Sequence, residues 1–124
     1  MYGFQKREKT MRELIKIFKA LSDENRIRIL KMLEIKPLCV CEITNILNLV
    51  TSTVSKHLSI LRDTDLIIDV KDGRWVNYSL NDESQKKYAK ELQPLIANWL
   101  SHNKKIISDA NKVNSVDRNK ICST

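Results

Sequence analysis

The strongest constraint on the fold is the dipeptide Asp72-Gly73, which stands between two β-prone runs at 66–71 and 74–80. This arrangement favours a two-residue hairpin, because such a turn needs positive φ angles that glycine adopts without steric cost. Apolar residues also recur at helical spacing in four segments before the hairpin and in one after it. These segments are about 6–21, 23–34, 40–47, 52–63 and 82–108, and Pro94 is expected to kink or split the last one.

The order of these elements predicts a fold class. The third and fourth helical segments are separated only by a short turn at Asn48–Thr51, and the hairpin follows at once. Two helices joined by a tight turn and followed by a hairpin form a winged helix-turn-helix. We therefore expect a mainly α protein with a small β-hairpin (α+β), in the order ααααββα. Residues 1–108 are expected to form one domain for DNA binding and dimerisation, and the polar residues 109–124 a mobile tail.

The fourth helical segment presents short polar side chains where a surface helix usually carries charges. Hydroxyl groups approach base edges and phosphates without steric cost, and a net charge of +7 favours a polyanionic partner. Cationic side chains beside the hairpin turn could reach a minor groove. The predicted contacts with double-stranded DNA are Thr51, Ser52, Thr53, Ser55, Lys56, His57, Ser59, Lys71 and Arg74. The alternative for this segment is an amphipathic helix that is rich in hydroxyl groups but does not bind DNA. The alternative for His57 is a packed, hydrogen-bonded side chain rather than a base contact.

A pair of thiols, Cys39 and Cys41, opens the third helical segment. Residues two apart on an ideal helix point about 200° away from each other. Both sulfurs can therefore bind one ion only where the backbone becomes extended or irregular. Thiolates select soft ions, which makes arsenite, antimonite, cadmium, lead and zinc the candidates. Two buried cysteines acting as small hydrophobic side chains are the alternative.

The number of available ligands narrows the choice of ion. A tetrahedral zinc or cadmium site uses four ligands, but no cysteine or histidine precedes Cys39, and His57 and His102 lie in different segments. A pyramidal trivalent metalloid needs three sulfurs or fewer, and Cys122 is the remaining cysteine. The sequence therefore predicts Cys39, Cys41 and Cys122 as ligands of As(III) or Sb(III), bound as an inducer rather than a permanent cofactor. An unused terminal thiol is the alternative for Cys122.

The sequence also predicts a cellular setting. No stretch approaches the ~18 consecutive apolar residues of a membrane span, and the N-terminus lacks the apolar stretch of a signal peptide. Cysteines as close as Cys39 and Cys41 make a poor disulfide framework. We therefore expect a cytoplasmic protein with free thiols and no membrane partner.

Four segments, 19–30, 38–43, 52–62 and 66–78, together resemble the ArsR/SmtB family of metal- and metalloid-responsive repressors. Leu38-Cys39-Val40-Cys41 is similar to the arsenic-sensing branch, although such sensors often carry a third cysteine where this chain has Thr44. The resemblance implies a homodimer joined by the first and last helices, which releases operator DNA when the thiols bind inducer. The stripes on those two helices are too apolar to leave exposed on a small domain. The predicted dimer interface is Leu14, Phe18, Tyr88, Leu92, Ile96 and Trp99.

The leading hypothesis is a repressor that trivalent arsenic or antimony releases from DNA. The same fold could instead sense thiol oxidation or a divalent soft metal (cadmium, lead or zinc) through the same thiols. A thiol enzyme such as an arsenate reductase is disfavoured, because its Cys-x5-Arg loop would need arginine where Asn45 and Leu47 stand. We therefore expect no enzymatic activity.

Overall fold

The computed structural model describes residues 2–122. It is mainly helical with one small antiparallel sheet, which confirms the predicted fold class. Strand β1 and helices α6 and α7 are additional to the predicted order. The elements are α1 (Tyr2–Leu21), α2 (Glu24–Leu33), β1 (Leu38–Cys39), α3 (Val40–Leu47), α4 (Thr51–Asp63), β2 (Ile67–Asp72), β3 (Trp75–Leu80), α5 (Lys87–Asn98), α6 (Lys104–Ser115) and α7 (Arg118–Ile121).

Helices α3 and α4 form the predicted helix-turn-helix. Asn48 ends α3 in the left-handed region with a φ of 57°, a conformation that asparagine tolerates better than most residues. Its amide donates to the carbonyl of Thr44 at 2.8 Å, so the turn to α4 is short and anchored. Ile43 on α3 and Leu58 on α4 are fully buried in the core that these helices share with α2. The relative orientation of α3 and α4 is therefore fixed by packing as well as by the turn.

The sheet has the strand order β1-β3-β2, and β2 and β3 form the wing. Asp72 pairs with Trp75, so the turn residues are Gly73 and Arg74, one position later than predicted. Gly73 has a φ of 62°, the positive value that the first position of a type II′ turn requires. Strand β1 pairs with β3 through Leu38 and Cys39, which join Tyr78 and Asn77 respectively.

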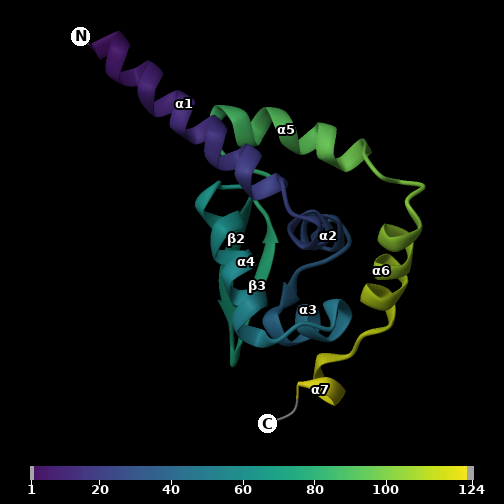
Figure 1. Ribbon diagram of the computed structural model, residues 1–124. Helices are drawn as coiled ribbons and strands as arrows, with labels where there is room; N and C mark the ends of the chain where they lie inside the picture. Colours follow the sequence, from purple (N-terminus) through teal and green to yellow (C-terminus); the bar gives the residue numbers. More distant parts are fainter. Residues whose placement is uncertain (1, 123–124) are drawn as a thin grey trace.

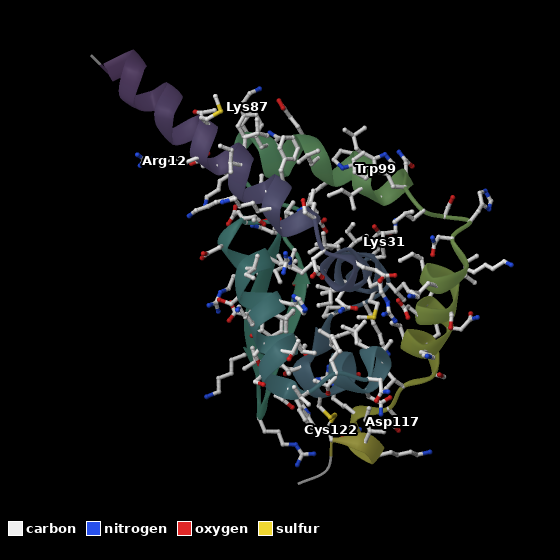
Figure 2. The ribbon with its side chains drawn as sticks, viewed as in Figure 1. Arg12, Lys31, Lys87, Trp99, Asp117 and Cys122 are labelled. Atoms are coloured by element: carbon white, nitrogen blue, oxygen red, sulfur yellow. A yellow bond between two sulfur atoms is a disulfide. The ribbon has the colours of Figure 1, made fainter. Side chains whose placement is uncertain are left out.

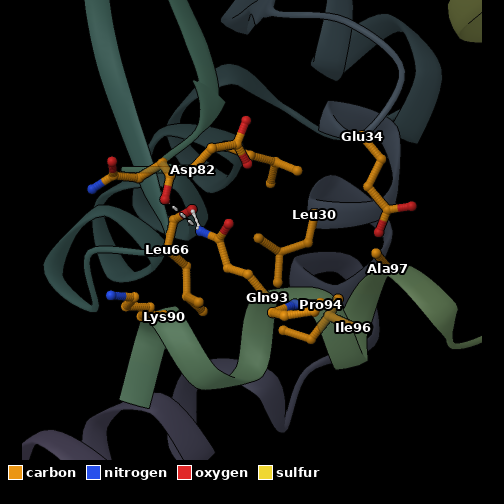
Figure 3. Close-up of a pocket in the computed structure, with 11 residues that line it drawn as sticks. Leu30, Glu34, Leu66, Asp82, Lys90, Gln93, Pro94, Ile96 and Ala97 are labelled. Carbon is orange, nitrogen blue, oxygen red and sulfur yellow. Dashed lines mark hydrogen bonds between the residues drawn. The ribbon is translucent and has the colours of Figure 1, made fainter. Parts of the chain in front are cut away.

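Helix α5 is not split at Pro94, which was one of the two outcomes expected there; the predicted last segment is instead divided after Asn98, between α5 and α6. The helix continues through Pro94 to Asn98, and the chain leaves it at Trp99, whose backbone is extended. Pro94 lies on the side of α5 that lines a cavity of about 350 Å³ against α2 and the base of the wing (Figure 3). In this region Gln93 donates from Nε2 to the carbonyls of Leu66 at 3.2 Å and Asn81 at 2.8 Å, which fastens α5 to the wing.

Residues 109–122, which the sequence predicted to be a polar tail without periodicity, belong largely to helices α6 and α7. Helix α6 runs across residue 108 and is capped by Asn103, whose side chain accepts from the amides of Lys105 and Ile106. It packs on α2 and α3, and short α7 packs on α3. Figure 1 shows α1 and α5 together at one end of the molecule, and α7 beside α3 at the other. We call residues 104–122 the C-terminal arm.

Candidate DNA-binding surface and thiol site

Helix α4 is held by one apolar edge and exposes the opposite face. Val54, Leu58 and Leu61 are fully buried, so the rotation of the helix about its axis is fixed. The other face consists of the side chains predicted to contact DNA. The structure places six of them on the exposed surface: Thr51, Ser52, Thr53, Ser55, Lys56 and Ser59.

His57 differs from its neighbours because it is half-buried and paired. Its Nδ1 lies 3.1 Å from Nη1 of Arg26, which also donates to the carbonyls of Ala20 at 2.7 Å and Lys19 at 3.1 Å. A guanidinium only donates hydrogen bonds, so Nδ1 of His57 accepts and the proton of a neutral ring sits on Nε2. Arg26 and His57 therefore tie α4 to the junction of α1 and α2.

The tip of the wing carries the two predicted cations. Lys71 and Arg74 are both exposed. The guanidinium carbon of Arg74 lies 4.6 Å from the centroid of the Trp75 ring, a cation–π distance. A second guanidinium, that of Arg118, lies 5.3 Å from the same centroid. Trp75 therefore connects the wing tip to the C-terminal arm.

Cys39 lies where β1 ends and α3 begins. It has an extended backbone and is 3% exposed, and its amide donates to Oε1 of Glu42 at 2.9 Å. Burial raises the pKa of the Cys39 thiol, and the negative charge of Glu42 acts in the same direction. At neutral pH, Cys39 therefore carries its proton until a ligand or a change of structure displaces it.

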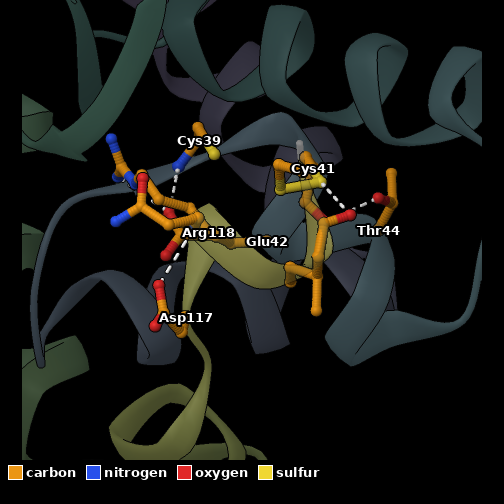
Figure 4. Close-up of a disulfide and its surroundings, with 9 residues drawn as sticks. Cys39, Cys41, Glu42, Thr44, Asp117 and Arg118 are labelled. Atoms are coloured by element: carbon orange, nitrogen blue, oxygen red, sulfur yellow. Dashed lines mark hydrogen bonds and ion pairs between the residues drawn. A yellow bond between two sulfur atoms is a disulfide. The ribbon is translucent and has the colours of Figure 1, made fainter. Parts of the chain in front are cut away.

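The structure corrects the expectation of three free thiols, because Cys41 and Cys122 form a disulfide. Their Cα atoms are 5.8 Å apart although 81 positions separate them in the sequence. Figure 4 shows the Cys39 side chain apart from this bond, and Figure 2 shows Cys122 beside α3. The predicted ligand Cys122 is thus adjacent to Cys41, while Cys39 is the free cysteine.

The C-terminal arm is held by charged groups that the sequence analysis did not single out. Asp109 is 2% exposed and accepts from Nε and Nη2 of Arg28 at 2.8 and 2.9 Å. Arg118 donates from Nη2 to Oε1 of Glu42 and to Oδ1 of Asn77, both at 2.8 Å. Paired charges in such positions dock α6 on α2 and α7 on α3. The arm thereby brings Cys122 to the start of α3.

The residues predicted to join two copies lie on α1 and α5 or, for Trp99, directly after α5, and these two helices pack against each other. Phe18 is 54% exposed and Trp99 47% exposed, whereas Ile96 is buried within the chain at 8%. Leu14, Tyr88 and Leu92 are half-buried. Figure 2 shows Trp99 at the end of α5 away from α1. Large apolar side chains exposed in this way are a feature of surfaces that make protein–protein contacts.

Two structural features of residues 2–122 bear on function. Within that part of the chain, no three His, Cys, Asp or Glu side chains are grouped so that they could hold a metal ion. In the same residues, no helix is both long and apolar enough to span a membrane.

The chain matches known proteins along the segments just described. The family model for "Bacterial regulatory protein, arsR family" matches residues 23–69, from the start of α2 into β2. An arsenical resistance operon repressor of Escherichia coli K12 is 35% identical over 101 residues, which cover 72% of this chain and 86% of that protein. The chain belongs to the arsR family. As a family member it is a DNA-binding transcription regulator and not an enzyme.

Other relatives of this arsR-family chain differ in the ion that they are named for. A Staphylococcus aureus homologue of the cadmium resistance regulator CadC is 41% identical over 76 residues, which cover 60% of this chain and 63% of that protein. The chain thus spans just under two thirds of the length of that regulator. The solved winged helix-turn-helix domain of Mb0332 from Mycobacterium bovis has a TM-score of 0.59 at 22% identity, covering 74% of this chain and 85% of that one. This similarity supports the winged helix-turn-helix fold.

Proposed function

We propose that this regulator is a cytoplasmic homodimeric repressor that leaves operator DNA when trivalent arsenic or antimony binds its thiols. One observation carries the proposal. Cys41 and Cys122 are adjacent, and Cys39 lies two residues from Cys41 at the junction of the sheet and α3. Relatives named as arsenical and cadmium resistance regulators support a soft-ion signal.

The DNA contact is assigned to α4 and the wing. The exposed hydroxyls and Lys56 on α4 would enter the major groove, while Lys71 and Arg74 would approach the adjacent minor groove or its phosphates. His57 would contribute through its Nε2–H, because Nδ1 is taken by Arg26. Two copies joined through α1 and α5 would present two such surfaces to an inverted repeat. Phe18 and Trp99 are exposed for this contact, and Leu14, Tyr88, Leu92 and Ile96 would support it.

The inducer site needs the reduced protein. Reduction of the Cys41–Cys122 bond frees two adjacent thiols, and Cys39, two residues from Cys41, would supply the third sulfur that a pyramidal metalloid takes. Cys39 must then turn from its buried position towards the other two, so β1 and the first turn of α3 change conformation. Formation of the sulfur–metalloid bonds supplies the free energy for this change.

The short turn after α3 offers a route to DNA. Only Asn48 to Val50 separate α3 from α4, so a change at the start of α3 displaces the exposed face of α4. Release requires that the inducer bind the DNA-free conformation more tightly than the DNA-bound one. By linkage, DNA must weaken inducer binding by the same factor.

A titration of DNA release tests the proposal. The probe is a duplex recovered by the reduced protein from a randomised DNA pool, hereafter the selected duplex. Arsenite or antimonite should release it at lower concentration than cadmium or zinc. Cys39→Ser or Cys41→Ser should keep DNA binding and abolish release, whereas Cys122→Ser should weaken release less. If Cys39→Ser and Cys41→Ser both release the selected duplex at the arsenite concentration that the parent needs, the assignment of the site is refuted.

The disulfide itself favours a second candidate, a repressor that senses thiol oxidation. The Cys41 and Cys122 thiols would exchange with an oxidised low-molecular-weight disulfide to give the protein disulfide and two reduced thiols. Oxidised glutathione added to the reduced protein would then change its affinity for the selected duplex without any metalloid. The same affinity before and after complete oxidation, checked by intact mass, would eliminate this candidate.

A further inference from the structure

Arg118 occupies the point where the C-terminal arm meets both the thiol site and the wing. Its Nη2 atom donates to Oε1 of Glu42 and to Oδ1 of Asn77, each at 2.8 Å. Its guanidinium carbon also lies 5.3 Å from the centroid of the Trp75 ring. One side chain on α7 therefore contacts α3 and β3 at once.

The two partners of Arg118 both touch Cys39. Oε1 of Glu42, the atom that accepts from Arg118, also accepts from the amide of Cys39 at 2.9 Å. Asn77 is the residue of β3 that pairs with Cys39 in the sheet. The backbone of Cys39 thus donates to the carboxylate that holds Arg118, and Cys39 also pairs in the sheet with Asn77, the other residue that Arg118 holds. Figure 4 shows Cys39, Glu42 and Arg118 in this cluster.

The cluster continues towards the wing tip. Nδ2 of Asn77 donates to Oδ2 of Asp72 at 3.3 Å, and Trp75 lies against Arg74. Asp72 and Trp75 are the pair that closes the turn carrying Arg74. A displacement of Asn77 or of the Trp75 ring therefore reaches the part of the wing that is assigned to DNA.

We propose that Arg118 is a positioning residue that couples the thiol site to the wing, giving inducer binding a second route to DNA besides the turn into α4. The proposal rests on the proposed function, because it names how that same site acts. When Cys39 turns towards a metalloid, its amide leaves Glu42 and β1 separates from Asn77. When Cys122 becomes a ligand, α7 moves with it, since Arg118 and Cys122 are joined by the helical bond from the Cys122 amide to the Arg118 carbonyl at 2.8 Å.

The burial of the pair explains why this contact can transmit a change. The Glu42 side chain is 3% exposed and that of Arg118 is 20% exposed, so water cannot readily replace Arg118 as the partner of the buried carboxylate. Any movement of the carboxylate must therefore be followed by the guanidinium or leave a buried charge unpaired. A planar guanidinium also fixes the angle between its two acceptors, which a lysine ammonium would not.

The coupling factor tests the proposal. It is the dissociation constant for the selected duplex with saturating arsenite divided by the constant without arsenite, measured for the reduced full-length protein. Arg118→Gln keeps an NH2 group but loses the positive charge and shortens the side chain. Asn77→Ala removes the acceptor on the wing and leaves the Glu42–Arg118 pair intact. Lys120→Gln is the matched control, since it removes a positive charge from an exposed position on the same helix.

Residues that carry coupling modulate it by roughly 2- to 30-fold, and we expect Arg118→Gln and Asn77→Ala each to lower the coupling factor within that range. The double variant should lose little more than either single variant, because both break one connection. Lys120→Gln should keep the parent's factor. A purely structural role for Arg118 would weaken DNA binding equally with and without arsenite, and an unchanged coupling factor in both single variants would overturn the proposal.

The outcomes also separate this inference from the proposed function. If the parent itself fails to release DNA with arsenite, the proposed function fails. If arsenite releases DNA from the parent, and Arg118→Gln and Asn77→Ala have the same coupling factor as the parent and Lys120→Gln, only the route through Arg118 is wrong and the proposed function stands. If circular dichroism shows that Arg118→Gln does not fold, the coupling factor of Asn77→Ala decides whether the proposal holds.

Discussion

The Cys41–Cys122 bond closes a loop that contains most of the fold, so its reduction should change stability strongly. The two residues are 81 positions apart, and the chain-entropy relation gives about 4.5 kcal/mol at 25 °C for a loop of this length. Because α7 also packs on α3 through Arg118, reduction should remove the covalent constraint without undocking the arm. We therefore expect the reduced protein to fold, with a free energy of unfolding lower by up to about 4.5 kcal/mol.

Urea unfolding followed by circular dichroism measures this difference. The oxidised parent, the reduced parent and Cys122→Ser should be compared at one protein concentration, because a dimer's stability depends on it. Reduced parent and Cys122→Ser should share one midpoint, below that of the oxidised parent. In thermal unfolding the gap should be up to about 18 °C, at about 4 °C per kcal/mol for a chain of this size. Coincident midpoints for all three samples would refute the reasoning, since the bond would then constrain nothing in the unfolded state.

Three further changes test other parts of the structure. Asp109→Ala should lower the free energy of unfolding by about 3 kcal/mol, because it leaves the guanidinium of Arg28 without its partner; a loss in urea unfolding well under 1 kcal/mol would contradict the docking of α6. Phe18→Glu should give a monomer in sedimentation velocity, whereas Lys19→Glu on the same helix should stay dimeric. Lys56→Ala should reduce the slope of log affinity for the selected duplex against log salt by about one, and an unchanged slope would remove Lys56 from the phosphate contacts.

The helix-turn-helix and the wing could be predicted because their signals are local. Val54, Leu58 and Leu61 follow one another at helical spacing, and all three are fully buried. Gly73 marked the hairpin and occupies a turn position with positive φ, although the turn is one residue later than predicted. The exposed hydroxyl face of α4 followed from the same periodicity.

The C-terminal arm could not be predicted in the same way, because distant contacts hold it. The apolar stripe of α6 is short, and its anchor is Asp109, a charged residue whose partner Arg28 lies 81 positions away. Asn103 does cap α6, and a polar cap followed by Ile106 and Val113 was a weak signal that could have found the helix. Once the arm is missed, the neighbourhood of Cys122 is missed with it.

Strand β1 and the position of Cys39 illustrate the same limit. Two residues are too few to show an alternating pattern, so only the pairing with β3 reveals the strand. The sequence placed the thiol pair at the start of α3, as observed, but gave no sign that Cys39 belongs to the wing sheet. The disulfide was unexpected for a related reason. The spacing of Cys39 and Cys41 does not indicate which of the two lies beside Cys122 in the folded chain.

The most direct test of the central claim is arsenite-driven release of the selected duplex from the fully reduced protein. Fluorescence anisotropy should be recorded for the parent and for a Cys39→Ser/Cys41→Ser double variant at matched DNA affinity. The account predicts that arsenite lowers the anisotropy of the parent complex to that of free DNA and leaves the variant complex unchanged. If the double variant releases the duplex at the parent's arsenite concentration, the account is contradicted, because the thiols at the start of α3 are then not the sensor.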